Sequence, residues 1–211
     1  IFSALELADS GLRVLLLEKG RDLEERVCPI IAGRAEKCVS CRPCSMVSGF
    51  GGAGAYSDGK LTLTPDVGGL LGTMLDGERL HELIAYVDSL YVRFGAPDRV
   101  FGEGTEVDSL VSRAVLAGLR LVPVRLRHLG CEYCRRVLES MRTHLRSRID
   151  IKTGMAVTGV EVDGTRVTGV RLASGETLKC RFLICAPGRE GAEWLTCLAR
   201  SQGLTVQTNP V

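Results

Sequence analysis

The chain has 211 residues, 45% of them hydrophobic, which is enough to fill the core of one large domain or two small ones. Its 27 Lys and Arg nearly balance 25 Asp and Glu, so the net charge of +2 does not suggest a nucleic-acid or membrane partner. No apolar run is long enough to span a membrane, no signal pattern is present, and nine cysteines in a chain of this size favour free thiols or metal ligands, which together predict a cytoplasmic protein.

The first twenty residues predict a helix, a turn and a strand. Small and apolar residues up to Ala8 suit a buried helix, Gly11 suits its C-terminal cap, and the run from Leu12 to Leu17 suits a strand. An acidic residue, Glu18, follows the strand directly. In a nucleotide-binding βαβ unit a carboxylate at this point accepts hydrogen bonds from a ribose hydroxyl, although an acid at a strand end can also be an ordinary solvated residue.

A glycine-rich segment, "SGFGGAGAYSDGK", covers residues 48–60. Its glycines permit positive φ values and let backbone N–H groups approach a flat ring or a diphosphate. The glycines are Gly49, Gly51, Gly52, Gly54 and Gly59. The alternative is a glycine-rich surface loop.

Between residues 67 and 148 the apolar pattern takes the helical period and predicts three helices with stripes that face a core. The first helix is expected to end at Gly95-Ala96-Pro97. The stripes are Leu80, Leu83, Ile84, Val87, Leu90, Tyr91 and Phe94; then Val107, Leu110, Val111, Ala114 and Val115; then Cys134, Val137, Leu138, Met141 and Leu145. This region is predicted to be a helical insertion beside a sheet formed by the outer thirds of the chain.

His128, in "VPVRLRHLG", is either a structural hydrogen-bonding residue or a site residue. A concentration of arginines surrounds it and is either a solvated helix face or a phosphate-binding surface. These arginines are Arg125, Arg127, Arg135, Arg136, Arg142, Arg146 and Arg148. No pattern of aromatic residues among them supports base stacking, so no nucleic-acid partner is predicted.

The C-terminal third predicts a β-meander. A first strand ends at an Asp163-Gly164 turn, a second runs from Arg166 to Leu172, and a third, Phe182 to Cys185, follows a further turn and stops at Ala186-Pro187-Gly188. By itself the pattern also fits an edge hairpin covering a sheet.

The cysteines leave three interpretations open. Cys38, Cys41 and Cys44 have C-x2-C-x2-C spacing with Cys28 upstream, and Cys131 and Cys134 form a separate C-x2-C pair. Metal binding, reactive thiols and inert thiols are all compatible with this spacing. The remaining cysteines, Cys180, Cys185 and Cys197, are predicted to be small core residues.

Together these segments resemble the two-dinucleotide-binding-domain flavoproteins, and among them the bacterial family of uncharacterised FAD-dependent dehydrogenases, often labelled NAD(P)/FAD-dependent oxidoreductases. The resemblance rests on "CxxCxPC" before "SGFGGAGAYSDGKL", on "ELIAYVDSLYVRFGAP", on "PVRLRHLG" and on "APGREGAEWL", and covers nearly the whole chain. "EKG" and "CAPG" are shared by many flavoproteins. Relative to the family, we expect the N-terminal glycine fingerprint to end just before Ile1 and a C-terminal part to follow Val211.

The resemblance implies an α/β fold, a partial Rossmann-like FAD-binding domain with a β-meander and an inserted helical region. Glu18 would hold the ribose, the glycine segment the flavin or diphosphate, and Val157 the adenine end through its backbone. Ser57, Asp58 and Lys60 would lie near the isoalloxazine ring, where a lysine stabilises negative charge on reduced flavin. The implied cofactor-binding residues are Glu18, Lys19, Gly49, Gly51, Gly52, Gly54, Ser57, Asp58, Gly59, Lys60, Val157, Ala186, Pro187 and Gly188. No catalytic residue and no metal ligand are assigned.

The expected domains are residues 1–66 and 149–211 for the two segments of the FAD-binding domain and 67–148 for the helical insertion. The expected function is that of an FAD-dependent oxidoreductase that transfers hydride or electrons between FAD and an unknown small-molecule substrate, with NAD(P)H as a candidate reductant. The alternative is a cysteine-centred metal- or thiol-binding module on a flavoprotein-like scaffold without redox turnover.

Overall fold

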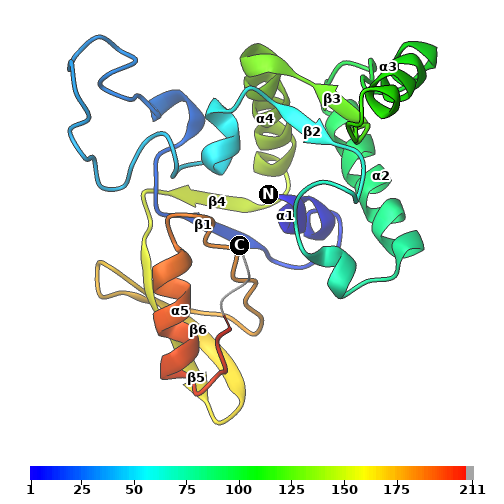
Figure 1. Cartoon of the computed structure of the whole chain (residues 1–211). Helices are drawn as coiled ribbons and strands as arrows, with labels where there is room; N and C mark the ends of the chain where they lie inside the picture. The colour runs from blue at the N-terminus through cyan, green and yellow to red at the C-terminus, as the bar shows by residue number, and fades with distance from the viewer. Residues whose placement is uncertain (208–211) are drawn as a thin grey trace. The chain divides into compact units, whose positions relative to one another are not determined.

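The computed structural model describes residues 1–207 and shows a mixed α/β chain with small sheets (Figure 1). It divides into two compact units: the first combines Ile1–Ala53 with the chain from Thr143 onward, and the second is Gly54–Arg142. These limits differ from the predicted boundaries at residues 66 and 148. The reason is that strand β2 (Lys60–Thr62) pairs with β3 (Leu126–His128), which places the end of the glycine segment in the second unit.

The first unit contains the predicted helix, turn and strand. Helix α1 (Phe2–Leu7) ends at the cap residue Ala8, and Gly11 lies in the following turn with φ +73°. Strand β1 (Leu15–Glu18) pairs in parallel with β4 (Asp150–Thr153), with Leu15 opposite Asp150 and Glu18 opposite Thr153. The strand thus starts three residues later than the apolar run, because its partner strand begins only at Asp150. The larger Rossmann-like sheet stays a prediction.

The meander is confirmed for its first hairpin and wrong for its third strand. Strands β5 (Val157–Asp163) and β6 (Arg166–Leu172) join at Gly164, whose φ of +58° is typical of a tight hairpin turn. The third strand is β7 (Thr177–Lys179), which occupies the free edge of β6 directly after the next turn. Residues 182–185 therefore find no strand partner within the described chain, and Phe182 is 79% exposed.

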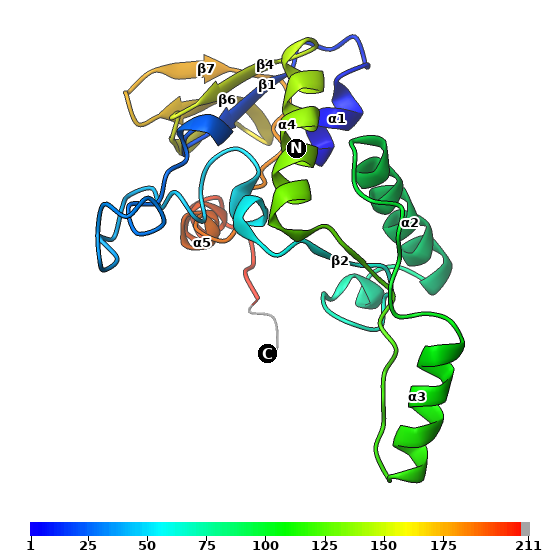
Figure 2. The ribbon, with the colours of Figure 1, turned by 90° about the horizontal axis from the view of Figure 1, so that it is seen from above.

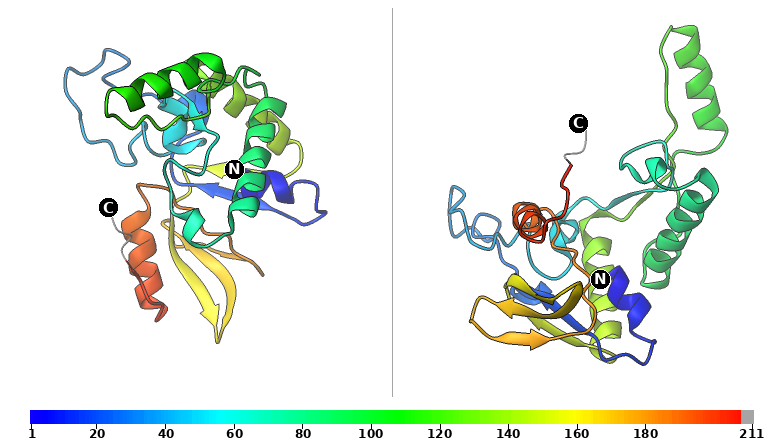
Figure 3. Two further views of the ribbon diagram at one scale, coloured as in Figure 1. Left: turned by 45° about the vertical axis from the view of Figure 1, so that its right-hand side comes forward. Right: turned by 90° about the horizontal axis from the view of Figure 1, so that it is seen from below.

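Short 3-10 helices and helix α5 complete the first unit. Helix η1 (Leu23–Glu25) is capped by Asp22, whose carboxylate accepts from the Leu23 N–H at 2.8 Å, and η2 (Gly52–Tyr56) straddles the boundary between the units. Helix α5 (Ala192–Ser201) lies beside the β5–β6 hairpin (Figure 3), where the Trp194 indole N–H donates to the Thr158 carbonyl. Cys185 and Cys197 are exposed and Cys180 is half-buried, so the prediction that they are core residues is wrong.

The second unit holds η3 (Leu71–Thr73), α2 (Gly77–Arg93), α3 (Thr105–Leu116) and most of α4 (Gly130–Arg146). Helix α2 begins at Asp76, whose carboxylate accepts from the Arg79 N–H at 2.8 Å, and it ends at Phe94 before Gly95 with φ +103°. The predicted end of α2 at Gly95 is confirmed. So is the apolar stripe of α4, whose five predicted residues are all buried.

Helix α3 differs from its prediction because its stripe is not a core stripe. None of its residues is buried, and Leu110 is 50% exposed. Figure 2 shows α3 flanked by the chain that runs back toward β3, and the backbone closes this turn where the Leu119 N–H donates to the Ala114 carbonyl. The returning segment runs beside α3, and it leaves every residue of the helix at least partly exposed.

Among residues 1–207, none of the helices combines the length and the apolar character needed to cross a bilayer. The cytoplasmic location stays a sequence-based prediction.

Candidate functional site

In the first unit, the carboxyl end of β1 lies against the start of the glycine segment. The Glu18 Oε1 atom accepts hydrogen bonds from the Gly20 N–H at 2.7 Å and from the Gly49 N–H at 3.0 Å. The backbones are linked further where the Phe50 N–H donates to the Arg21 carbonyl at 3.0 Å. Two backbone donors on one oxygen fix the Glu18 carboxylate in position.

The close approach of these two backbones depends on glycine at positions 20 and 49. A Cβ on Gly20 would lie 2.4 Å from the Gly49 nitrogen and 2.6 Å from the Ser48 carbonyl carbon. Gly49 has φ +117°, and its Cβ would lie 2.5 Å from Arg26 Cδ. These two glycines therefore allow the backbone after β1 and the start of the glycine segment to pack against each other.

The other glycines of the segment behave differently. Gly51, Gly52 and Gly59 have positive φ, as predicted, whereas Gly54 lies within η2 without a left-handed φ, so the prediction is wrong at that position. A Cβ on Gly52 or Gly54 would meet nothing within 4 Å. The backbone at Gly52 is thus open to a neighbouring molecule.

Arg26 organises this site and was not predicted from the sequence. It is 3% exposed, and its guanidinium donates to the carbonyls of Ser45 at 3.0 Å, Met46 at 3.2 Å and Phe50 at 2.7 Å. These bonds hold the chain that leads into the glycine segment. One arginine in an irregular polar stretch carries no periodicity or spacing that could have singled it out.

Glu190 brings the "APGREG" segment to the same place. Its carboxylate accepts from the Ser48 hydroxyl and lies 3.6 Å from Lys19 Nζ. Partial burial acts to raise the pKa of Glu190, but hydrogen bonds from Ser48 and the Cys44 backbone and the charge of Lys19 lower it overall. Glu190 was also missed, although it lies within a quoted motif.

The remaining predicted residues of the first unit lie apart from these contacts. Ala186 and Gly188 are exposed, and Pro187 is half-buried because Gly191 packs against it, with a Cβ on Gly191 reaching 2.4 Å from Pro187 Cβ. Val157 is half-buried opposite Leu172 at the start of the meander. The segments that meet directly are therefore residues 18–20, residues 48–50 and Glu190.

The Glu190 links predict an acid-sensitive contribution to stability. Because folding lowers the pKa of this carboxyl from its ordinary 4.5, its contribution is present above that value and is lost as the pH falls through the folded pKa. Glu190→Gln should lower the melting temperature near neutral pH, and the difference from wild type should disappear in acid. Thermal unfolding across pH measures this. Glu193→Gln, an exposed change on α5, should show no such convergence.

In the second unit, the end of the glycine segment is joined to the "RHLG" segment. Lys60 lies opposite His128 in the β2–β3 pair, the Leu129 N–H donates to the Gly59 carbonyl at 2.7 Å, and the Gly130 N–H donates to the Asp58 carbonyl at 3.0 Å. A hydrogen bond from Lys60 is the main cause that lowers the pKa of Asp58, and His128 adds a smaller effect. His128 is exposed beside Lys60, so the structure brings together two segments that the sequence singled out separately.

The arginines around His128 are mostly engaged with acids. Arg127 is buried and binds Asp88 at 2.6 and 2.7 Å. Other pairs are Arg125 with Glu103, Arg135 with Glu139, Arg136 with Glu132, Arg146 with Asp22 and Arg148 with Asp9. These pairs neutralise much of the positive charge, which argues against a phosphate-binding surface.

The cysteines form no metal centre within the part of the chain that the structure describes. There, no three side chains of His, Cys, Asp or Glu are grouped as a metal ion requires. Cys38 is exposed, while Cys28, Cys41 and Cys44 are half-buried.

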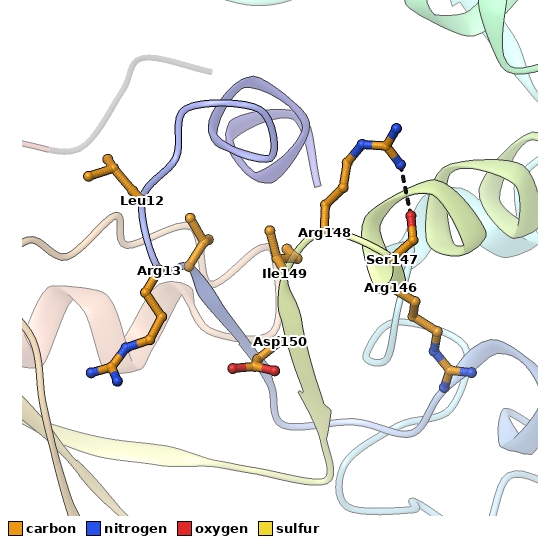
Figure 4. Close-up of a pocket in the computed structure, with 8 residues that line it drawn as sticks. Leu12, Arg13, Arg146, Ser147, Arg148, Ile149 and Asp150 are labelled. Carbon is orange, nitrogen blue, oxygen red and sulfur yellow. Dashed lines mark hydrogen bonds between the residues drawn. The ribbon is translucent and has the colours of Figure 1, made fainter.

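A pocket of about 260 Å³ in the first unit lies at the other end of β1 and β4 (Figure 4). It is lined by residues 12–14 and 146–150, next to the strand starts at Leu15 and Asp150. The side chains of Arg13 and Arg146 point away from each other there. Because ligands of parallel α/β sheets bind outside the carboxyl ends of the strands, this pocket is distinct from the place where Glu18 lies.

No family model and no curated protein matches this sequence. Solved structures with a similar chain path include L-amino acid deaminase from Proteus myxofaciens in complex with anthranilate (14% identity, 97% of this chain and 45% of that chain, TM-score 0.46). A second is L-amino acid deaminase from Proteus vulgaris (16% identity, 98% of this chain and 48% of that chain, TM-score 0.47). A third is glycine oxidase from Bacillus cereus (15% identity, 94% of this chain and 55% of that chain, TM-score 0.45). The chain spans about half the length of these neighbours.

Proposed function

We propose that this chain forms part of the FAD site of an FAD-dependent oxidoreductase. The observation that supports this most is the Glu18 carboxylate at the carboxyl end of parallel strand β1. Its Oε1 atom is held by the N–H groups of Gly20 and Gly49, and among residues 1–207 no other hydrogen bond to the Glu18 carboxylate is found. The Oε2 atom is thus free to accept a ribose hydroxyl.

The residues present fit such a cofactor. A carboxylate after a parallel strand is the usual acceptor for a nucleotide ribose, and here it is fixed before any ligand binds. Gly52 and Gly188 have positive φ, and a Cβ on either would meet nothing within 4 Å, so the backbone can be approached closely at both. Lys19 does not contact the cofactor in this proposal, because its ammonium group pairs with Glu190 and holds the segment around Glu190 in place.

FAD, when bound, supplies the hydride or electron transfer, and the chain supplies position and charge. Glu18 would orient the ribose, while Arg26 and Glu190 would keep the Ser48–Gly49 backbone against it. Ser57, Asp58, Gly59 and Lys60 belong to the second unit, and their assignment to the flavin ring stays a prediction from the sequence. The dehydrogenase assignment, with NAD(P)H as reductant, rests on the sequence resemblance alone.

Binding of FAD to the purified chain tests the proposal, measured by calorimetry and by the visible spectrum. Glu18→Ala should weaken binding about 10- to 100-fold, as expected for the loss of a hydrogen bond to a charged group. Glu176→Ala, in the exposed turn between β6 and β7, is the matched control and should bind as wild type does.

Two results would contradict the proposal: no FAD binding by the wild-type chain, or equal affinity of wild type and a folded Glu18→Ala variant. Circular dichroism of the variant is needed, because the substitution also leaves the Gly20 and Gly49 N–H groups without their acceptor. Glu18→Gln keeps an acceptor oxygen and removes the charge. It should therefore preserve the fold and still lower the affinity.

A further inference from the structure

The second C-x2-C pair lies in the first turn of α4, which begins at Gly130. Residues three apart on a helix face the same side, with Cβ atoms about 5–6 Å apart, which is wider than the roughly 3.5–4.5 Å of a formed disulfide but within reach once the first turn of the helix shifts. Cys131 and Cys134 thus have the spacing and the helix position of a dithiol that can close with a small backbone adjustment.

The two thiols differ in access. Cys131 is exposed, whereas Cys134 is 7% exposed. A disulfide in solution can therefore reach Cys131 directly, while Cys134 is reached only from within the protein. This difference assigns the attacking role to Cys131 and the resolving role to Cys134.

Neighbouring residues pack closely against the sulfur of Cys134. Gly59, with φ +67°, leaves room for it, because a Cβ there would lie 2.4 Å from Cys134 Sγ. Burial raises the pKa of the Cys134 thiol, a hydrogen bond with Ser57 offsets part of this, and the charges of Cys131 and Asp58 raise it further. Tyr91 also interacts electrostatically with this thiol.

We propose that Cys131 and Cys134 form a redox-active dithiol that reduces small-molecule disulfides by thiol–disulfide exchange. The Cys131 thiolate attacks one sulfur of the disulfide, that S–S bond breaks, and one thiolate leaves. Cys134 then loses its proton to solvent and attacks Cys131 Sγ, which forms the protein disulfide and releases the second thiolate. Two electrons pass from the protein dithiol to the disulfide. This activity uses neither Glu18 nor bound FAD.

The chain offers a direct test by peptide mapping after incubation with oxidised glutathione. Trypsin releases residues 128–135, "HLGCEYCR", which contain these two cysteines and no other, and residues 190–200, which contain only Cys197. After free thiols are blocked at low pH, mass spectrometry should find the first peptide with an internal disulfide, two hydrogens lighter. The Cys197 peptide is the internal reference, since it has one cysteine and cannot carry an internal disulfide.

Two variants separate the steps. Cys134→Ser should accumulate one glutathione on Cys131, and Cys131→Ser should leave Cys134 as a free thiol under the same conditions. Cys131 is exposed, so its replacement should not disturb the fold. Closure of the internal disulfide in wild type should become faster as the pH rises, because the buried Cys134 thiol must deprotonate first.

Two outcomes would overturn the proposal. One is that residues 128–135 of the wild type stay reduced when the Cys197 peptide is already glutathionylated. The other is that a mixed disulfide on Cys131 persists at every pH without closing. Formation of the internal disulfide at a glutathione ratio that leaves Cys197 unmodified would support it.

Discussion

Gly20→Ala should lower the free energy of unfolding by about 3 kcal/mol, at the upper end of the usual cost of adding a methyl group to a filled space. The added Cβ would lie 2.4 Å from the Gly49 nitrogen, and both partners are backbone, so neither can move aside cheaply. Relief of the overlap requires the Ser48–Gly49 backbone to retreat from Glu18. The same substitution should therefore weaken FAD binding in the proposed site.

Chemical denaturation and FAD titration of the variant measure these two effects. The matched control is Gly54→Ala, in the same segment, where a Cβ meets nothing within 4 Å and no left-handed φ is involved. It should change stability by no more than about 0.5 kcal/mol. If the two substitutions cost the same, the close contact between residue 20 and residue 49 is not a feature of the folded protein.

Arg127→Met should also be strongly destabilising, by about 3 kcal/mol. Arg127 and Asp88 are paired at 2.6 Å with side chains only 6% and 19% exposed, and Arg127 also donates to the Pro97 carbonyl. Removing one member of such a pair leaves a largely buried carboxylate without its counter-charge. The pair links α2 to β3, so its loss should loosen the second unit in particular.

The double variant Arg127→Met/Asp88→Asn separates charge from packing. It should be more stable than the single Arg127→Met variant, because no unpaired carboxylate remains. Arg79→Met provides the control, since the Arg79–Glu82 pair is also short, at 2.8 Å, but exposed, and its loss should cost about 0.5 kcal/mol or less. Equal costs for Arg127→Met and Arg79→Met in equilibrium unfolding would refute the prediction.

Local signals account for the elements that were predicted correctly. Gly95 ends α2 as predicted, because a left-handed glycine terminates a helix within one turn. Asp163-Gly164 makes the hairpin because the turn needs positive φ at that point. The apolar spacing of α4 predicts its buried face, since a stripe of that width must be covered.

The incorrect predictions share one cause, which is that an apolar run indicates a tendency to be buried without indicating a partner. Residues 182–185 have the composition of a strand, but β7 already occupies the available edge of β6. Helix α3 has a core-like stripe, yet its described neighbour is a single returning segment. Strand pairing and helix burial are completed by other parts of the chain, which local patterns do not specify.

The sequence alone determined which residue types are present for the candidate site. These are an acid after a strand, a glycine-rich segment and the small residues Ala186-Pro187-Gly188. Only the tertiary structure decided which of them meet. It placed the Gly49 N–H on Glu18, joined Glu190 to Ser48 and buried Arg26 under the entering chain. It also assigned residues 58–60 to the second unit through β3. These contacts join residues far apart in the chain, and their geometry depends on the packing of every element between them, which no local propensity encodes.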